Sequence, residues 1–125
     1  MASILIVDDA TESCEPLVRF LEKGGHKARC VPNGQIALVD VIQNRPDVVV
    51  LDLFMPEMDG PSFLEVLRSY LRLQSLPVVV LTALPDSPLA ERARFLKVNT
   101  ILVKTKATFE DIQKAIEEAI YQLPG

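Results

Sequence analysis

Apolar residues along this chain occur in two patterns, short continuous runs and longer stretches with helical spacing. The runs are too short for helices of ordinary length and too apolar for half-exposed strands. They therefore predict strands buried on both faces, as in parallel sheets. The predicted strands of this kind cover 3–7, 48–51, 77–81 and 100–103. A further run, 26–31, has mixed polarity and predicts a strand at a sheet edge.

Between the runs, apolar residues recur with the spacing of one helix face. This spacing predicts helices that end at Gly24-Gly25, run from about Gly34 to Asn44, from about Pro61 to Leu71, and through about Lys97, and begin near Thr108. The first helix could be capped by Thr11 or Ser13, and Pro16 within it favours an irregular or late start. Thr108 and Asp111 resemble a capping box at the start of the last helix.

The expected inward faces carry Ala37, Leu38, Val41 and Ile42 in the second helix and Phe63, Leu64, Leu67, Tyr70 and Leu71 in the third. The strand–helix unit occurs five times. This order predicts an α/β fold, with a parallel sheet, right-handed crossovers and helices on both faces. The 125 residues are expected to form one domain, 1–125.

The composition narrows the class of protein. Hydrophobic residues make up 49% and charged residues 24% of the chain, as in globular domains. The apolar runs are far shorter than a membrane span, and no basic segment precedes the first strand, so we expect neither membrane insertion nor a signal peptide. A net charge of -4 argues against direct nucleic-acid binding. These features predict a cytoplasmic domain.

The two cysteines, Cys14 and Cys30, are too few for a disulfide framework or a metal cluster, and their spacing fits neither. We therefore expect small buried thiols in a reducing compartment. His26 follows Gly25 at the start of a strand and is expected to be a surface residue without a role.

Polar side chains follow four of the predicted strands where their neighbours are apolar. They are Asp8 and Asp9, Asp52, Thr82, and Lys104. In a parallel sheet these ends lie at one edge, where α/β proteins place their sites. Crowded carboxylates raise one another's pKa values or hold a cation, and hard oxygen ligands select Mg²⁺ or Mn²⁺.

This set also suggests phosphoryl chemistry. A carboxylate can act as a nucleophile and form an aspartyl phosphate. The ammonium of Lys104 would neutralise charge on such a group, and the hydroxyl of Thr82 could donate a hydrogen bond to it. A lone Asp after a strand is more often a loop or cap residue, but the set in register favours a nucleophile at Asp52.

The chain resembles response-regulator receiver domains of two-component signalling, and is similar to single-domain chemotaxis-type receivers. The resemblance covers essentially the whole sequence. It rests on Ile6-Val7-Asp8-Asp9, Gly34 with Ala37-Leu38, Pro46-Asp47, the stretch from Leu51-Asp52 through Met55-Pro56 to Asp59-Gly60, Pro77 through Thr82-Ala83, and Lys104. The resemblance implies a flavodoxin-like fold with strand order 2-1-3-4-5.

The resemblance also implies roles for individual residues. Asp52 would accept a phosphoryl group from a histidine kinase or a phosphotransfer protein. Asp9 would be the main carboxylate ligand of Mg²⁺, together with Asp52, Asp8 bound mostly through water, and the backbone carbonyl of Phe54. Lys104 would pair with the phosphoryl group.

The resemblance also implies a route by which the signal leaves the site and the kinds of partner that receive it. Thr82 would swing toward the phosphoryl group and carry the signal to a partner surface formed by the last two helices and the strand that contains Ile101. A downstream protein partner, or an effector domain outside this chain, would receive the signal, and phosphorylation-dependent dimers are compatible with this reading. Whether a domain that phosphorylates only itself is an enzyme is a matter of definition.

Two positions depart from the family pattern. Ile101 occupies a position three residues before the lysine that is usually aromatic, so the switch would need a smaller side-chain movement. Thr105 replaces the usual proline of a cis peptide bond. Because a cis bond without proline costs about 2.5–4 kcal/mol, we predict that the Lys104–Thr105 bond is trans.

Phe54 and Leu84 lie two residues after Asp52 and Thr82. In receivers these positions flank the phosphoryl group and influence the approach of water. Neither apolar side chain can orient an attacking water molecule, and Phe54 is bulky enough to obstruct one. We therefore hypothesise slow self-dephosphorylation.

Two other functions compete with the phosphorylation switch. A degenerate receiver could act only as a phosphorylation-independent protein-interaction module, as Ile101 and Thr105 would favour. A metal-dependent phosphohydrolase would usually need an acid two residues after its nucleophile, where this chain has Phe54. The first alternative is therefore the stronger one.

Overall fold

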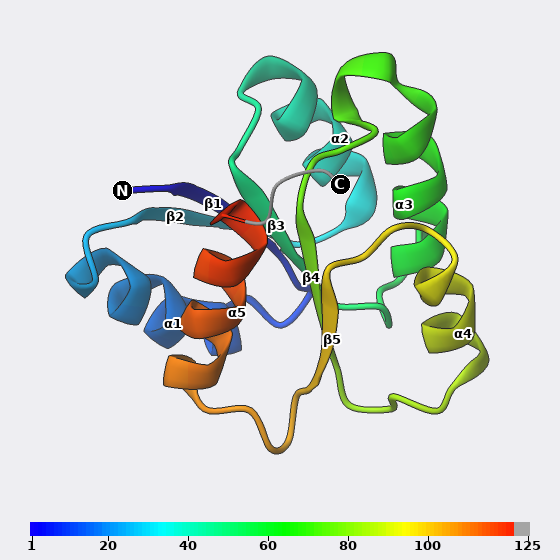
Figure 1. Cartoon of the computed structure of the whole chain (residues 1–125). Coiled ribbons are helices and arrows are strands. Elements are labelled where there is room, and N and C mark those ends of the chain that lie inside the picture. Colours follow the sequence, from blue (N-terminus) through cyan, green and yellow to red (C-terminus); the bar gives the residue numbers. More distant parts are fainter. Residues whose placement is uncertain (122–125) are drawn as a thin grey trace.

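A computed structural model shows an α/β fold and describes residues 1–121 (Figure 1). The last four residues of the predicted domain lie outside the described part. The strands are β1 (Ser3–Val7), β2 (Lys27–Val31), β3 (Val48–Leu51), β4 (Val78–Thr82) and β5 (Thr100–Val103). The helices are α1 (Thr11–Lys23), α2 (Gly34–Gln43), α3 (Gly60–Ser69), α4 (Pro88–Arg94) and α5 (Phe109–Tyr121), with a short 3₁₀ helix at Leu71–Leu73.

The strands form one parallel sheet in the order β2-β1-β3-β4-β5, the predicted flavodoxin-like arrangement. The central β1, β3 and β4 are almost entirely buried, as their continuous apolar runs predicted. The strand with mixed polarity, β2, is at the expected edge.

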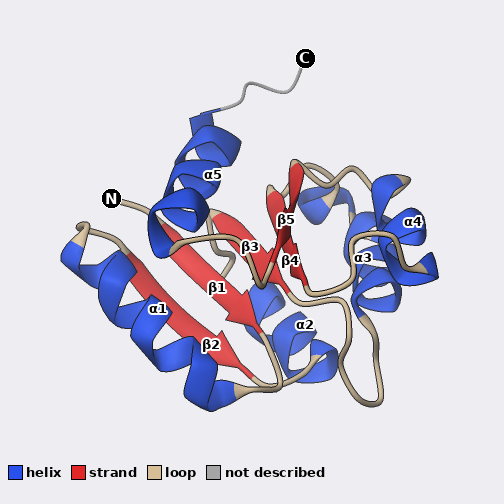
Figure 2. Ribbon diagram, turned by 90° about the horizontal axis from the view of Figure 1, so that it is seen from below, coloured by secondary structure: helices blue, strands red, loops and turns tan. Residues whose placement is uncertain are grey.

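Helices cover both faces of the sheet (Figure 2). Apolar residues of α2, α3 and α4 pack on one face, against Leu5 and Val7 of β1. Residues of α1 and α5 pack on the other face, against Ile4 and Ile6. Because side chains alternate along a strand, one five-residue run supplies both layers of the core.

Some helix boundaries and faces differ from the predictions. Tyr70 and Leu71 are 46% and 84% exposed, because α3 ends at Ser69 and the chain turns there into the 3₁₀ helix. Ile42 of α2 is also exposed, at 55%. The helix α4 ends at Arg94, before Lys97 adopts a left-handed conformation with φ 60°.

The helix α1 does not begin late, and neither predicted residue caps it. Its N-cap is Ala10, whose amide donates a hydrogen bond to the Asp8 Oδ1 atom at 2.8 Å. This bond fixes the backbone that enters α1, so the helix starts at Thr11 and includes Pro16. At the start of α5, Thr108 and Asp111 exchange hydrogen bonds of 2.9 and 3.0 Å, which confirms the capping box.

The expectation of free thiols was wrong. Cys14 of α1 and Cys30 of β2 form a disulfide, with their Cα atoms 6.4 Å apart. They are 16 positions apart in sequence, but the β1–α1–β2 crossover packs α1 directly against β2. A spacing rule for local motifs cannot detect such a pair.

His26 is also more than a surface residue, because its side chain is only 9% exposed. The imidazole Nδ1 accepts a hydrogen bond from the Ala2 amide at 3.1 Å, and Nε2 lies 3.1 Å from a Glu117 carboxylate oxygen. These contacts connect the beginning of β1 to α5.

Within the described residues, no peptide bond is cis, so the Lys104–Thr105 bond is trans as predicted. Nor does any described helix have the length and apolarity required to cross a bilayer.

Arg68 connects the end of α3 to the segments that precede β4 and β5. Its guanidinium donates hydrogen bonds to five backbone carbonyls, those of Leu73, Gln74, Leu76, Leu96 and Lys97. Burial lowers the pKa of Arg68. Backbone carbonyls in these turns have few alternative partners, so the loss of the guanidinium leaves several of them unsatisfied.

We predict that Arg68→Met lowers the free energy of unfolding by about 3 kcal/mol, because polar groups that lose their partner keep their desolvation penalty. Arg72→Met is the matched control, since Arg72 is exposed and has no polar contact among the described residues. Urea denaturation followed by circular dichroism measures both variants. Equal stabilities of the two variants would contradict this role of Arg68.

Candidate functional site

The predicted polar residues meet at the carboxyl edge of the sheet. Asp8 and Asp52 directly follow β1 and β3, Thr82 ends β4, and Lys104 directly follows β5. Backbone hydrogen bonds of the sheet continue past the strand ends, from the Asp52 amide to the Val7 carbonyl at 3.0 Å and from the Lys104 amide to the Thr82 carbonyl at 2.7 Å. The rigid ladder of strands therefore sets the positions of these side chains.

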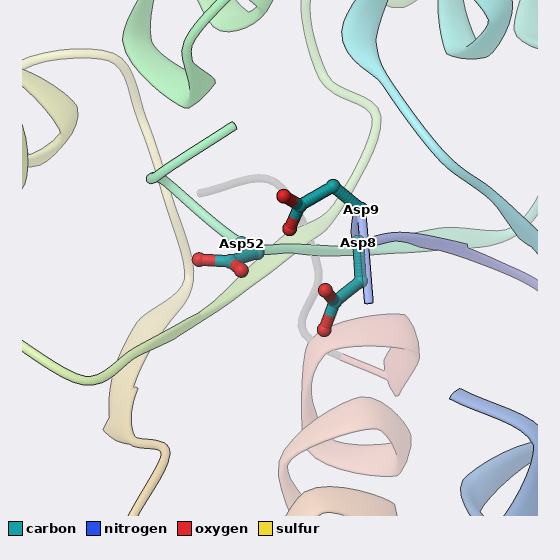
Figure 3. A group of neighbouring side chains, drawn as sticks. All are labelled: Asp8, Asp9 and Asp52. Atoms are coloured by element: carbon teal, nitrogen blue, oxygen red, sulfur yellow. The ribbon is translucent and has the colours of Figure 1, made fainter. Parts of the chain in front are cut away.

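Three carboxylates form the centre of the site (Figure 3). One oxygen from each of Asp8, Asp9 and Asp52 lies within 4.8 Å of the others. Asp8 and Asp52 are buried, at 5% and 9% exposure, whereas Asp9 is exposed. A small divalent cation with oxygen ligands fits such a group, and its exposed side leaves room for water or phosphate ligands.

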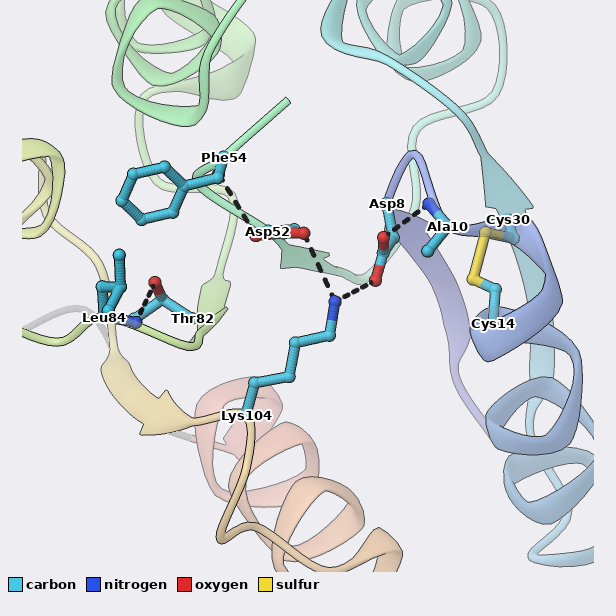
Figure 4. A network of polar contacts seen from close by, with 9 residues as sticks. All are labelled: Asp8, Ala10, Cys14, Cys30, Asp52, Phe54, Thr82, Leu84 and Lys104. Atoms are coloured by element: carbon cyan, nitrogen blue, oxygen red, sulfur yellow. Dashed lines mark hydrogen bonds and ion pairs between the residues drawn. A yellow bond between two sulfur atoms is a disulfide. The ribbon is translucent and has the colours of Figure 1, made fainter. Parts of the chain in front are cut away.

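Lys104 enters the site from the end of β5 and contacts two of these carboxylates (Figure 4). Its Nζ atom lies 2.8 Å from Asp8 Oδ2 and 3.3 Å from Asp52 Oδ2. Burial acts to lower the pKa of Lys104, but the hydrogen bond to Asp8 and the charges of Asp52 and Asp8 outweigh it and raise this pKa. Lys104 is therefore the cation that offsets the repulsion among the acidic groups.

The carboxyl of Asp52 has a raised pKa. Burial is the largest cause, and the charge of Asp8 adds to it, while the hydrogen bond from the Phe54 amide and the charge of Lys104 act in the opposite direction. The Phe54 amide donates to Asp52 Oδ1 at 3.2 Å. The loop that follows β3 therefore holds the Asp52 carboxylate in place, and burial makes ionisation of this carboxyl less favourable than in water.

The loop between β3 and α3 is tightly folded around Asp52. The Gly60 amide donates to the Leu53 carbonyl at 2.9 Å. A Cβ atom at Gly60 would lie 2.8 Å from the Leu53 Cα atom, so the close approach requires glycine. Asp59 then caps α3 by accepting a hydrogen bond from the Ser62 amide at 2.8 Å. These contacts fix the loop that carries Phe54.

Thr82 and Ile101 occupy the positions expected for them on neighbouring strands. Thr82 is fully buried, and its hydroxyl accepts a hydrogen bond from the Leu84 amide at 3.2 Å. Ile101 is partly buried and packs against the core cluster beneath α3 and α4. Phe54 and Leu84 are 40% and 56% exposed at the mouth of the site.

The disulfide beside the site was missed by the sequence reasoning. Cys14 lies in the first turns of α1 and Cys30 near the end of β2, so both are close to the edge of the sheet that carries Asp8 (Figure 4). The predicted crossover from β1 through α1 to β2 contained this information. It could have placed the two cysteines side by side before the structure was known.

Residues 4–117 match the family model of the response regulator receiver domain. This chain belongs to that family. It is therefore a receiver domain of the kind found in two-component response regulators, consistent with phosphorylation-dependent signalling.

Among curated proteins, the chain is 37% identical over 66% of its length to the sensory transduction protein RegX3 of Mycolicibacterium smegmatis. It spans only 35% of that protein. It is 35% identical, again over 66% of its length, to protein PilH of Pseudomonas aeruginosa, of which it spans 68%.

Solved structures show the same fold. The receiver domain of a signal transduction histidine kinase from Syntrophus aciditrophicus superposes with a TM-score of 0.88 at 27% identity, covering 99% of this chain and 93% of that one. The Mn²⁺-bound form of response regulator Rcp1 superposes with a TM-score of 0.77 at 25% identity, covering 99% and 96%.

We predict that Asp52→Asn raises the free energy of unfolding by on the order of 1 kcal/mol at pH 7 in the presence of a chelator, because it removes a buried charge. The raised pKa gives the sign. The folded state holds the Asp52 proton more tightly than the unfolded state, so ionisation costs stability as the pH rises through the raised pKa. The advantage of the variant should therefore shrink as the pH falls toward the ordinary value of 3.8.

Thermal unfolding across this pH range measures the effect, with Asp86→Asn as the control. Asp86 is an exposed carboxylate with no polar partner in the described part of the chain. A destabilised Asp52→Asn variant, or an advantage that does not depend on pH, would contradict the electrostatic account of the site.

Proposed function

We propose that this receiver domain is a phosphorylation-dependent signalling switch that accepts a phosphoryl group on Asp52 from a histidine kinase or a phosphotransfer protein. The observation that carries this proposal is the convergence of three carboxylates and Lys104 at one edge of the sheet, with the Lys104 ammonium between Asp8 and Asp52. Family membership supports it but does not assign these roles to individual residues.

Mg²⁺, or Mn²⁺, is the proposed cofactor. Asp9, Asp52 and the backbone carbonyl of Phe54 would hold it, with Asp8 bound mostly through water. The donor set supports this choice, because carboxylate and carbonyl oxygens suit hard cations, and the Mn²⁺-bound form of Rcp1 has the same fold. The cation supplies positive charge beside the phosphoryl oxygens when it is bound.

The transfer itself uses groups of this chain. An ionised Asp52 oxygen attacks the phosphorus atom, and an oxygen–phosphorus bond forms as the phosphorus–nitrogen bond to the donor histidine breaks. The Phe54 amide fixes the orientation of the Asp52 carboxylate. Lys104 moves its ammonium from the carboxylates to the phosphoryl oxygens, where it stabilises the developing charge.

The signal would leave the site through Thr82. Its hydroxyl would exchange the Leu84 amide for a phosphoryl oxygen, and this movement would shift the loop that follows β4. Because Ile101 has no aromatic ring, the rearrangement at β5 would be small. The partner surface would lie on α4, β5 and α5, where a downstream protein, an effector domain of a longer protein, or a second phosphorylated copy would bind. We place this activity in the cytoplasm.

The alternative is a phosphorylation-independent interaction module. The contacts of Lys104 favour it, because an ammonium that already pairs with Asp8 and Asp52 neutralises part of the acidic cluster without a metal. Ile101 and Thr105 also depart from the family pattern. Metal binding and phosphorylation separate the two functions.

We predict that incubation with Mg²⁺ and acetyl phosphate adds one phosphoryl group to the wild type, and none to Asp52→Asn, as measured by intact mass. A chelator should abolish the addition. If metal binds but the small donor fails, a histidine kinase or phosphotransfer protein is the next donor. Failure with all donors, and no metal binding, would favour the interaction module, whereas turnover of a phosphate ester would indicate a phosphohydrolase.

We predict that the phosphorylated domain loses its phosphoryl group slowly, and that polar residues at Phe54 and Leu84 accelerate the loss several-fold, because they can orient an attacking water molecule. The variant Phe54→Asn/Leu84→Gln is compared with Leu71→Gln, which makes the same kind of change at an exposed leucine outside the site. Half-lives from intact mass after removal of the donor give the rates. An unchanged half-life in the double variant would remove this hypothesis.

A further inference from the structure

The disulfide joins two elements, α1 and β2, that are both hydrogen-bonded to or continuous with the segment that carries Asp8 and Asp9. Cys30 precedes Val31, whose carbonyl accepts a hydrogen bond from the Asp8 amide at 3.1 Å. Cys14 lies in the helix that follows Ala10, whose amide donates to the Asp8 carboxylate at 2.8 Å. The hydrogen bonds of the Asp8 amide and of the Asp8 carboxylate thus connect this residue to the two elements that carry the cysteines.

The beginning of α1 has weak support from its own residues. Among the described residues, no side chain caps the helix, and Pro16 has no amide hydrogen to donate to the carbonyl of Glu12. Cys14, at 2% exposure, anchors this turn to the core and, through the disulfide, to β2. The disulfide therefore stabilises the N-terminal end of α1, which has no side-chain cap within the described residues and lacks the hydrogen bond that Pro16 cannot donate.

We propose that Cys14 and Cys30 form a reversible thiol–disulfide site whose oxidation tightens the binding of a divalent cation by Asp8 and Asp9. The disulfide restrains the entry to α1 and so keeps Asp9, which lies between the end of β1 and that entry, near the carboxylates of Asp8 and Asp52. Reduction lets this entry fluctuate and weakens the cation site. The part that concerns the cation rests on the proposed function, whereas the redox site itself does not.

The proposed location supports reversibility, because disulfides in cytoplasmic proteins are usually transient or redox-sensing. The exposures of the two cysteines also differ. Cys14 is buried, whereas Cys30 is partly exposed and is the point of attack for an external thiol.

A low-molecular-weight disulfide is the oxidant that converts the Cys14 and Cys30 thiols to the protein disulfide. The Cys30 thiolate attacks one sulfur of that disulfide, forms a mixed disulfide and releases one thiol. The Cys14 thiolate then attacks the Cys30 sulfur and releases the second thiol, and the two protein thiols lose their protons to solvent or to the departing thiolates. A dithiol reverses both steps and leaves as its own cyclic disulfide.

Thiol titration in glutathione redox buffers tests the redox site without any metal. We expect two free thiols in the reducing buffers, none in the oxidising ones, and a melting temperature at least about 5 °C higher in the oxidised form. The single variants locate the point of attack. Cys30 in Cys14→Ala should acquire glutathione in the folded state, whereas Cys14 in Cys30→Ala should not. Two free thiols in every buffer would overturn the proposal.

Calorimetric titration with Mg²⁺ then tests the coupling. We expect the oxidised wild type to bind Mg²⁺ about fivefold or more tightly than the reduced wild type. Cys14→Ala/Cys30→Ala should bind with one affinity in both buffers, close to that of the reduced wild type.

Equal affinities of the two wild-type forms would overturn the coupling while leaving the proposed function intact. Absence of Mg²⁺ binding in both forms, with normal thiol exchange, would instead overturn the proposed function and the coupling together. These two failures are therefore distinguishable.

Discussion

Repulsion among three carboxylates at one edge of the sheet is the constraint on which the site depends. The fold brings Asp8, Asp9 and Asp52 together through backbone hydrogen bonds between strands, which do not depend on the side chains. Lys104 offsets part of the repulsion by pairing with Asp8 and Asp52. Burial and the charge of Asp8 still raise the pKa of Asp52, so the ionised form of its carboxyl remains less favourable than in water.

The surrounding structure holds this unfavourable cluster in place. The parallel strands β1 and β3 carry two of the acids and are buried on both faces. On one side the close approach at Gly60 closes the loop after Asp52. On the other side, the hydrogen bond from Ala10 and the disulfide restrain the segment after Asp8. Under the proposed function, this rigid frame pre-organises the cation site, because folding of the surrounding structure, and not binding of the cation, brings the carboxylates together.

The sequence predicted the fold and the convergence of the polar strand-end residues for one physical reason. Continuous apolar runs mark strands buried on both faces, and parallel strands end at a common edge, so Asp8, Asp52, Thr82 and Lys104 had to meet there. What the sequence did not predict depends on contacts between elements. The exposure of Leu71 follows from a turn after α3 that helical periodicity does not encode.

The cysteines and the histidine show the same limitation. Cys14 and Cys30 pair across a crossover, and no local motif describes that distance. His26 is held by Ala2 and Glu117, which lie near opposite ends of the chain. Local patterns thus located the elements and their ends, whereas pairings over long sequence separations required the packed structure.

The most direct test of the cation site is anomalous diffraction from crystals grown with Mn²⁺. The account predicts one strong peak at the carboxyl edge of the sheet, within coordination distance of carboxylate oxygens of Asp9 and Asp52 and of the Phe54 carbonyl oxygen. The same position should lose its peak in crystals of Asp9→Asn. A wild-type crystal saturated with Mn²⁺ that shows no peak there, or shows Lys104 still bridging Asp8 and Asp52 with the ion bound elsewhere, would contradict the account.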